Sequence, residues 1–233
     1  METIRDTWQV ASVTGAREVF VYGASGHGKV VTDILLAGRQ TVAGYIDDGD
    51  GLAGTQVMGI PVVGDFEWLK RYTAAHKVAI ALGIGGNCNR RQVAERCRHS
   101  GIELVTAVHP SAVVASSAVI GAGTVLMASS VVNPDARIGC GVIVNTAAIV
   151  EHDCVIGDYA HLSPNSAIGG AGALGATSWL GMGAVIIHGV RVGIGTIVGA
   201  GAVVVRDLPD GVVAFGVPAR IQRQAHCLPA SSK

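Results

Sequence analysis

The sequence lacks an excess of charge of either sign, because 17 Lys and Arg side chains balance 17 Asp and Glu side chains over 233 residues. It also contains no basic run, which argues against nucleic acid and against an anionic membrane surface as partners. No apolar run reaches about 18 residues, and residues 1–16 are polar. We therefore expect no membrane span, no secretion signal and a cytoplasmic location.

Cysteine and aromatic residues are also scarce. The five cysteines are odd in number and lack C-x-x-C spacing, which favours free thiols in a reducing compartment. The chain has 3 Phe, 4 Tyr and 3 Trp against 33 Gly. This composition fits a coiled, turn-rich solenoid better than a globule packed around aromatic rings.

One aliphatic residue in every six marks the second half of the chain. A mostly small residue stands two positions before each of them, as Cys154 does before Ile156, and we expect Cys154 to be a buried filler. A hexapeptide repeat of this kind predicts a parallel β-helix. With three hexads per coil, residues i and i+18 stack about 4.8 Å apart. The column consists of Ile120, Leu126, Val132, Ile138, Val144, Val150, Ile156, Leu162, Ile168, Leu174, Leu180, Ile186, Val192, Val198 and Val204.

The first hundred residues alternate strand and helix signals, which predicts a small parallel α/β sheet of Rossmann type. The expected strands lie at 18–22, 42–46, 78–82 and 103–107, and the expected helices at 29–37 and 90–100. We therefore divide the chain into a Rossmann-like domain at 17–106, a β-helix at 107–206 and a C-terminal tail at 207–233. The tail carries Gly216–Arg220, which either ends the last coil or has a further role.

The turn after the first strand is the first candidate site. Its glycines would let backbone amides approach a phosphate, and the following helix N-terminus favours an anion. Asp47 and Asp48 end the second strand, where related folds bind a ribose or a base edge. The spacing G-x-x-G-x-G differs from the dinucleotide fingerprint and disfavours NAD. We expect a nucleotide here, against the alternative of a tight turn without a ligand. The turn consists of Gly23, Ala24, Ser25, Gly26, His27 and Gly28.

The second candidate site surrounds His152, which lies between Glu151 and Asp153. The residue just after each inward aliphatic is usually glycine, but at two successive positions here it is Asn145 and Glu151. A neutral imidazole oriented by a carboxylate is a good general base near pH 7. One coil further on, Gly170 should stack on His152, and its backbone N–H could meet an oxyanion. His188 reads as a solvated surface side chain.

Together these motifs resemble one family, the bacterial nucleotide-amino-sugar N-acetyltransferases of the sialic-acid O-acetyltransferase type. The resemblance covers about residues 18–222. It rests on Gly23–Val31, Tyr45–Asp48, Val108–Ala112, Asn145–Cys154 with His161, and Gly216–Arg220.

The resemblance implies a Rossmann-like domain joined to a left-handed β-helix, and direct attack of a sugar amine, expected at C4, on acetyl-CoA without an acyl-enzyme. It implies His152 as the base and Asp153 as its orienting acid. His161 and the amide of Gly170 would contact the acetyl carbonyl, and Asn145 would line the sugar pocket. It further implies nucleotide contacts from the loop at 23–28 and from Asp47 and Asp48. Coenzyme A would lie between neighbouring subunits of a homotrimer, and no metal is expected.

Three alternatives remain open at this point. O-acetylation of a sialic acid or another sugar hydroxyl could use the same base. A β-helix hydratase of the carbonic-anhydrase type would need three converging histidines, for which His152, His161 and His188 are available. A non-catalytic sugar-nucleotide binding module is the third, and the oriented His152 argues against it.

Overall fold

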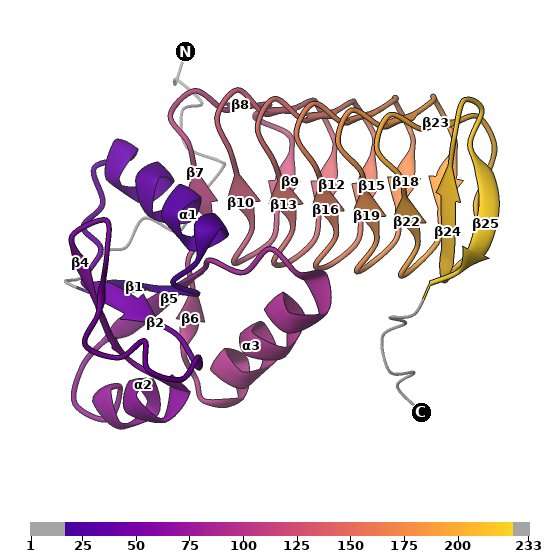
Figure 1. Cartoon of the computed structure of the whole chain (residues 1–233). Helices are drawn as coiled ribbons and strands as arrows, with labels where there is room; N and C mark the ends of the chain where they lie inside the picture. The colour runs from indigo at the N-terminus through magenta and orange to yellow at the C-terminus, as the bar shows by residue number, and fades with distance from the viewer. Residues whose placement is uncertain (1–16, 226–233) are drawn as a thin grey trace, which may run out of the picture.

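The computed structural model describes residues 17–225, which form an α/β domain and a long parallel β-helix lying beside it (Figure 1). The predicted fold class, a Rossmann-like domain followed by a left-handed β-helix, is confirmed. Within the described residues, no helix is long and apolar enough to cross a membrane.

A six-stranded sheet forms the centre of the α/β domain, in the order β3-β4-β2-β1-β5-β6. All neighbouring strands pair in parallel except β3 and β4, which form an antiparallel hairpin. The strands are β1 (Glu18–Tyr22), β2 (Gly44–Ile46), β3 (Gln56–Val57), β4 (Ile60–Gly64), β5 (Val78–Leu82) and β6 (Glu103–Leu104).

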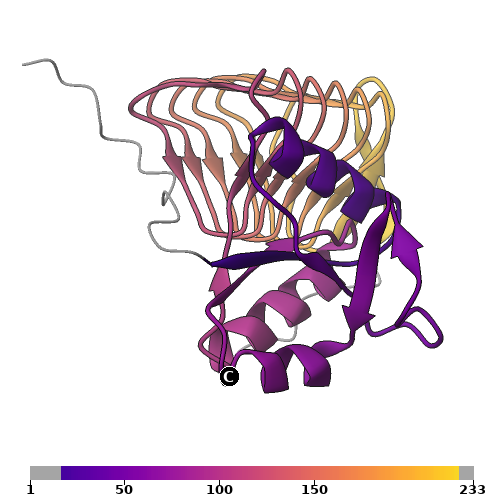
Figure 2. The same ribbon diagram turned by 90° about the vertical axis from the view of Figure 1, so that its left-hand side faces the viewer.

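Three helices cover the two faces of this sheet. Helix α1 (Gly26–Ala37) lies on one face, and α2 (Phe66–Tyr72) and α3 (Asn87–His99) lie on the other (Figures 1 and 2). The sequence analysis missed α2 and the β3–β4 hairpin. Both are too short for hydrophobic periodicity to separate them from loop.

The chain order of the strands places a topological switch point between β1 and β5. From β1 the chain leaves toward β2, whereas from β5 it leaves toward β6 on the opposite side. The loops that follow these two neighbouring strands therefore diverge at their carboxyl ends. Such a topological switch point is where open α/β sheets bind ligands.

The β-helix is a three-sided prism whose strands repeat every 18 residues, as the hexads predict. Ile143 pairs with His161, and His161 pairs with Trp179. The first face consists of β7 (Ala107–Val108), β10 (Val125–Leu126), β13 (Ile143–Val144), β16 (His161–Leu162), β19 (Trp179–Leu180), β22 (Ile197–Val198), β24 (Val212–Phe215) and β25 (Arg220–Gln224).

The other two faces have two-residue strands throughout. The second face consists of β8 (Val113–Val114), β11 (Val131–Val132), β14 (Ile149–Val150), β17 (Ala167–Ile168), β20 (Val185–Ile186) and β23 (Val203–Val204). The third face consists of β9 (Val119–Ile120), β12 (Arg137–Ile138), β15 (Val155–Ile156), β18 (Ala173–Leu174) and β21 (Arg191–Val192).

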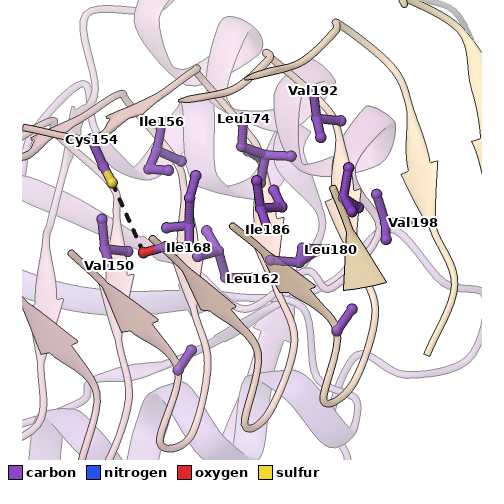
Figure 3. Packing of buried hydrophobic residues seen from close by; sticks show 14 of the residues in the cluster. Val150, Cys154, Ile156, Leu162, Ile168, Leu174, Leu180, Ile186, Val192 and Val198 are labelled. Carbon is purple, nitrogen blue, oxygen red and sulfur yellow. Dashed lines mark hydrogen bonds between the residues drawn. The ribbon is translucent and has the colours of Figure 1, made fainter. Parts of the chain in front are cut away.

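The aliphatic column fills the inside of the prism (Figure 3). Ile168 and Leu180 are fully buried there, and Cys154 is a buried filler as predicted. Cys97, Cys140 and Cys154 are free thiols. Cys88 is disulfide-bonded, so the prediction of free thiols is wrong for that residue, and Cys227 lies outside the described residues.

The α/β domain packs against the first face of the prism. Val125 and Ile143 of that face share a buried cluster with Val21 of β1 and Ile34 of α1. At the far end of the prism, β24 pairs in parallel with β22, so the stacking continues beyond residue 206, where the repeat ends in the sequence. Only β25 then turns back as an antiparallel strand.

Candidate active site

The glycine loop leads directly from β1 into the N-terminus of α1. Gly23 has a φ of 109°, and a methyl group on Gly28 would overlap the carbonyl oxygen of Gly23. These two positions therefore require glycine, because α1 packs close over the loop. A methyl group on Gly26 would meet nothing within 4 Å. Ser25 is the helix N-cap but makes no side-chain capping bond. Within the described residues, no acceptor is recorded for the N–H groups of Gly26 and His27, which leaves two donors at the start of α1 for an anion.

The two aspartates after β2 already have partners within the chain. Asp47 accepts hydrogen bonds from Ala24 N–H at 2.7 Å and from Gly49 N–H at 2.8 Å. This carboxylate therefore holds the glycine loop in shape, whatever it contributes to a ligand.

Asp48 forms an ion pair with Arg96 at 2.6 Å and accepts a 2.7 Å hydrogen bond from the Tyr22 hydroxyl. Although partial burial opposes it, the Arg96 and Tyr22 hydrogen bonds hold the pKa of Asp48 below its usual value. Asp48 is therefore a charged link between β2 and α3 at the edge of the loop.

His152 lies exposed at the turn between β14 and β15, where its Nδ1 is 2.8 Å from Asp153 Oδ2. A carboxylate can only accept, so Nδ1 carries the hydrogen and Nε2 keeps its lone pair. The hydrogen bond to Asp153 raises the pKa of His152. Asp153 has a φ of 60°, and its N–H donates to the Pro134 carbonyl, which fixes the carboxylate beside the ring. This pair has the geometry of an oriented general base.

Gly170 lies directly beside the His152 ring. A methyl group on Gly170 would come within 2.5 Å of His152 Nε2, and the Ala171 N–H donates to the His152 carbonyl. Within the described residues, no acceptor is recorded for the Gly170 N–H. The predicted stacking of these two positions is confirmed, and it leaves a backbone donor next to the basic nitrogen.

Glu151 is held by a residue that the sequence analysis did not include. Asn133 lies one coil earlier, and its Nδ2 donates to Glu151 Oε2 at 3.0 Å. The two side chains stack because 133 and 151 differ by 18. Glu151 is therefore directed toward Asn133, while Asp153 alone bonds to the His152 ring.

His161 lies on the first face of the prism and is 6% exposed. Asn145 Oδ1 accepts from the Thr146 N–H, so its Nδ2 donates to His161 Nε2 at 3.0 Å. The neutral ring then carries its hydrogen on Nδ1, a buried atom, and a backbone hydrogen bond with Gly85 opposes the lowering of the pKa only in part. Burial, together with the positive charge of Arg90, lowers the pKa of His161 to about 3.

Trp179 stacks on the His161 ring, with centroids 4.9 Å apart, and donates from Nε1 to Ser163 Oγ at 2.7 Å. Trp179 was not among the predicted site residues. Its position 18 residues after His161 would have placed it directly beside that ring. In the strands of the first face, the residue before each inward aliphatic is itself aliphatic at most positions. His161 and Trp179 stand at that position in two successive strands.

One chain does not bring all the candidate residues together. His152 and Gly170 lie at the edge between the second and third faces, whereas His161 and Asn145 lie on the first face, opposite that edge. His27 lies near the second group, because a methyl group on Gly85 would come within 3.9 Å of His27 Cβ and the Gly85 carbonyl accepts from Arg90. Within residues 17–225, no group of three His, Cys, Asp or Glu side chains is placed to hold a metal ion.

Known proteins resemble this chain in sequence and in fold. Residues 18–97 match the family model of the PglD N-terminal domain. The UDP-N-acetylbacillosamine N-acetyltransferase of Bacillus subtilis is 39% identical over 124 residues, which make up 48% of this chain and about half (52%) of that relative.

Two solved structures match over nearly their whole length. A histidine variant of the GDP-perosamine N-acetyltransferase from Caulobacter crescentus, in complex with CoA and GDP-perosamine, is 43% identical with a TM-score of 0.85, covering 89% of this chain and 98% of that one. The acetyltransferase domain of PglB from Neisseria gonorrhoeae, in complex with acetyl coenzyme A, is 39% identical with a TM-score of 0.83, covering 89% and 100%.

Proposed function

Because the chain belongs to the family of nucleotide-amino-sugar N-acetyltransferases, which use acetyl-CoA, we propose that it acetylates the C4 amine of a nucleotide-linked amino-deoxy sugar. The observation that carries this proposal is the oriented pair of His152 and Asp153 beside the free N–H of Gly170. The relatives are named for N-acetylation, which favours an amine over a sugar hydroxyl as the acceptor.

We propose the following chemistry. The sugar amine attacks the thioester carbon of acetyl-CoA while Nε2 of His152 accepts the proton that the nitrogen loses. The Gly170 N–H donates to the oxyanion that forms, as a preorganised donor at the site of developing charge. The carbon–sulfur bond then breaks, and the protonated His152 returns its proton to the coenzyme A thiolate. No acyl-enzyme forms.

The two domains divide the binding of substrates in this proposal. The α/β domain at 17–106 binds the nucleotide through the glycine loop, at the topological switch point between β1 and β5. The β-helix at 107–206 binds acetyl-CoA along its coils. Asn145 and His161 lie on the face that the α/β domain covers, which is where a sugar attached to that nucleotide would extend.

We further propose a homotrimer with the active site at the subunit boundary. The outward residues of the second face form an uninterrupted apolar ridge, and a patch of this kind on a prism marks an interface. The acetyl group can contact both Gly170 and His161 only if they belong to different subunits. The ridge consists of Val113, Val131, Ile149, Ala167, Val185 and Val203.

The test is direct assay of the purified protein with acetyl-CoA and UDP-, dTDP- or GDP-linked 4-amino sugars. Release of the coenzyme A thiol and a product carrying one added acetyl group on nitrogen, by mass spectrometry and NMR, are the expected results. Acetylation of a hydroxyl instead would contradict the choice of an amine. Failure with all three nucleotide classes would contradict the proposed substrate class.

A further inference from the structure

Arg90 is a fully buried side chain on α3. All three of its nitrogen atoms donate to oxygen atoms, and every acceptor is a carbonyl group. The bonds run from Nε to Gly141 O (2.7 Å), from Nη1 to Ile84 O (3.1 Å) and Gly85 O (2.9 Å), and from Nη2 to Asn87 Oδ1 (2.9 Å), Tyr159 O (2.7 Å) and Ala160 O (3.2 Å).

These bonds connect the two halves of the molecule at the proposed site. Ile84 and Gly85 belong to the loop that follows β5, at the topological switch point. Gly141 and Tyr159 lie one coil apart on the edge of the β-helix, and Ala160 immediately precedes His161. One planar guanidinium therefore holds the nucleotide-side loop against the strand that carries His161.

Asn87 extends the same connection by one more coil. Its Nδ2 donates to the carbonyl oxygens of Thr177 (2.9 Å) and Ser178 (3.1 Å), directly before Trp179. Its Oδ1 accepts from Arg90. Positions 141, 159 and 177 differ by 18 each, so Arg90 and Asn87 contact three successive coils in register. The stacked pair of His161 and Trp179 lies beside the last two of them.

Burial of the Arg90 charge is not explained by a gain in folding stability. Among the described residues, no carboxylate is recorded as its partner, and a buried cation without a counter-ion is costly. Burial lowers the pKa of Arg90 to about 9, which still leaves it charged at neutral pH. No negatively charged group is recorded as acting on the pKa of the two nearby imidazoles, His27 and His161. Burial first and Arg90 second lower the pKa of His27 to about 4, and the same two causes, with His27, lower that of His161.

We propose that Arg90 is a positioning residue for acetyl transfer, which fixes the loop after β5 against the strand of His161 so that the nucleotide and the sugar pocket keep one relative geometry. The inference rests on the proposed function. Its second consequence is that His27 and His161 face the ligand as neutral imidazoles. Among the described residues, the buried Nε2 of His27 has no recorded hydrogen-bond partner.

The decisive variant is Arg90→Lys, which keeps the charge but cannot span six acceptors from one nitrogen. We expect kcat/KM for the nucleotide sugar to fall about tenfold to a hundredfold, because a misplacement of about 1 Å can cost that much. KM for acetyl-CoA should stay within about twofold. The control is Arg91→Lys, one residue along α3, whose recorded side-chain partner is the exposed Glu95, and it should leave all constants unchanged.

A second measurement needs no substrate and so separates this inference from the proposed reaction. NMR titration of imidazole-labelled wild-type protein should show His27 and His161 neutral down to about pH 5. In Arg90→Met both pKa values should rise, whereas in Arg90→Lys they should stay low. Unchanged pKa values in folded Arg90→Met would overturn the electrostatic part of the inference.

If both Arg90 variants fail to fold, Asn87→Ala tests the same anchor, because it removes one of the six acceptors and the two bonds to the third coil. A smaller rise in KM for the nucleotide sugar, with KM for acetyl-CoA unchanged, would support the positioning role. A loss of thermal stability with both constants unchanged, in either Arg90→Lys or Asn87→Ala, would reduce Arg90 to a structural link and overturn the inference.

Discussion

At the scale of single residues, the site depends on which nitrogen of His152 is free. Its Nδ1 is engaged by Asp153, and the other nitrogen lies beside Gly170. His152→Ala should therefore lower kcat about 10²- to 10⁴-fold, the range for removing a positioned base, with little change in the binding of either substrate. Steady-state kinetics and calorimetric titration of both ligands check this. A variant that keeps more than about a third of wild-type turnover would rule His152 out as the base.

Asp153 should control the pH at which this base works. Its hydrogen bond raises the pKa of His152, and only the neutral imidazole accepts a proton, so activity falls as the pH drops below that raised pKa. Asp153→Asn removes the charge and lowers the pKa. The acidic limb of the kcat/KM profile should then move to lower pH, while kcat at neutral pH falls less than in His152→Ala. A limb that stays in place, or moves to higher pH, would contradict the assignment.

At the scale of elements, the glycine loop and the turn after β2 form one unit because Asp47 bonds to both. Charge-assisted bonds of this kind contribute about 1.5–3 kcal/mol, which corresponds to about tenfold to a hundredfold in affinity. Asp47→Ala should raise KM for the nucleotide sugar by that factor and leave KM for acetyl-CoA within about twofold. Kinetics with each substrate varied in turn measure this. Equal effects on both constants would place the nucleotide elsewhere.

The same unit shows where prediction from the sequence stops. The sequence indicated a strand, a glycine turn and two acidic residues, but not that Asp47 and Asp48 already hold internal partners. The bond from Gly49 to Asp47 is local and was foreseeable as a turn cap. The other partners, Ala24, Tyr22 and Arg96, belong to other segments, and single-chain patterns carry no signal for such contacts. Hexads behave differently, because every sixth residue must face the same core. The pairing of 143 with 161, and of 161 with 179, therefore follows from counting.

Counting also explains the separation of the two histidines. His152 and His161 are nine residues apart, which is half a coil, so they must lie on opposite sides of the prism. The spacing of the repeat therefore already predicts that His152 and His161 of one chain cannot meet. Arg90 had no such signal, since a helix pattern places a charged residue outward by default. Only the docking of α3 onto the coils shows that Arg90 is buried.

At the scale of the whole molecule, the apolar ridge on the second face predicts the assembly. Ile149 is the third of the six residues of that ridge and is 36% exposed in the single chain. Ile149→Asp would place a charge in the proposed interface, and we expect dissociation to monomers and loss of most activity. Val119→Asp, at an apolar position on the third face that is 56% exposed, is the control and should remain trimeric. Light scattering measures the oligomeric state of each variant, and the acetyl-transfer assay measures its activity. A fully active monomer would refute the shared site.

The most direct test of a shared site is complementation between two inactive variants. His152→Ala and His161→Ala each remove one side of the site, and we expect each alone to be nearly inactive. In trimers reassembled from an equal mixture, a site is complete when His152 of one subunit meets His161 of its neighbour. Random assembly makes about one quarter of the sites complete, so about a quarter of wild-type activity should return. Activity no higher than that of the separate variants would contradict the account.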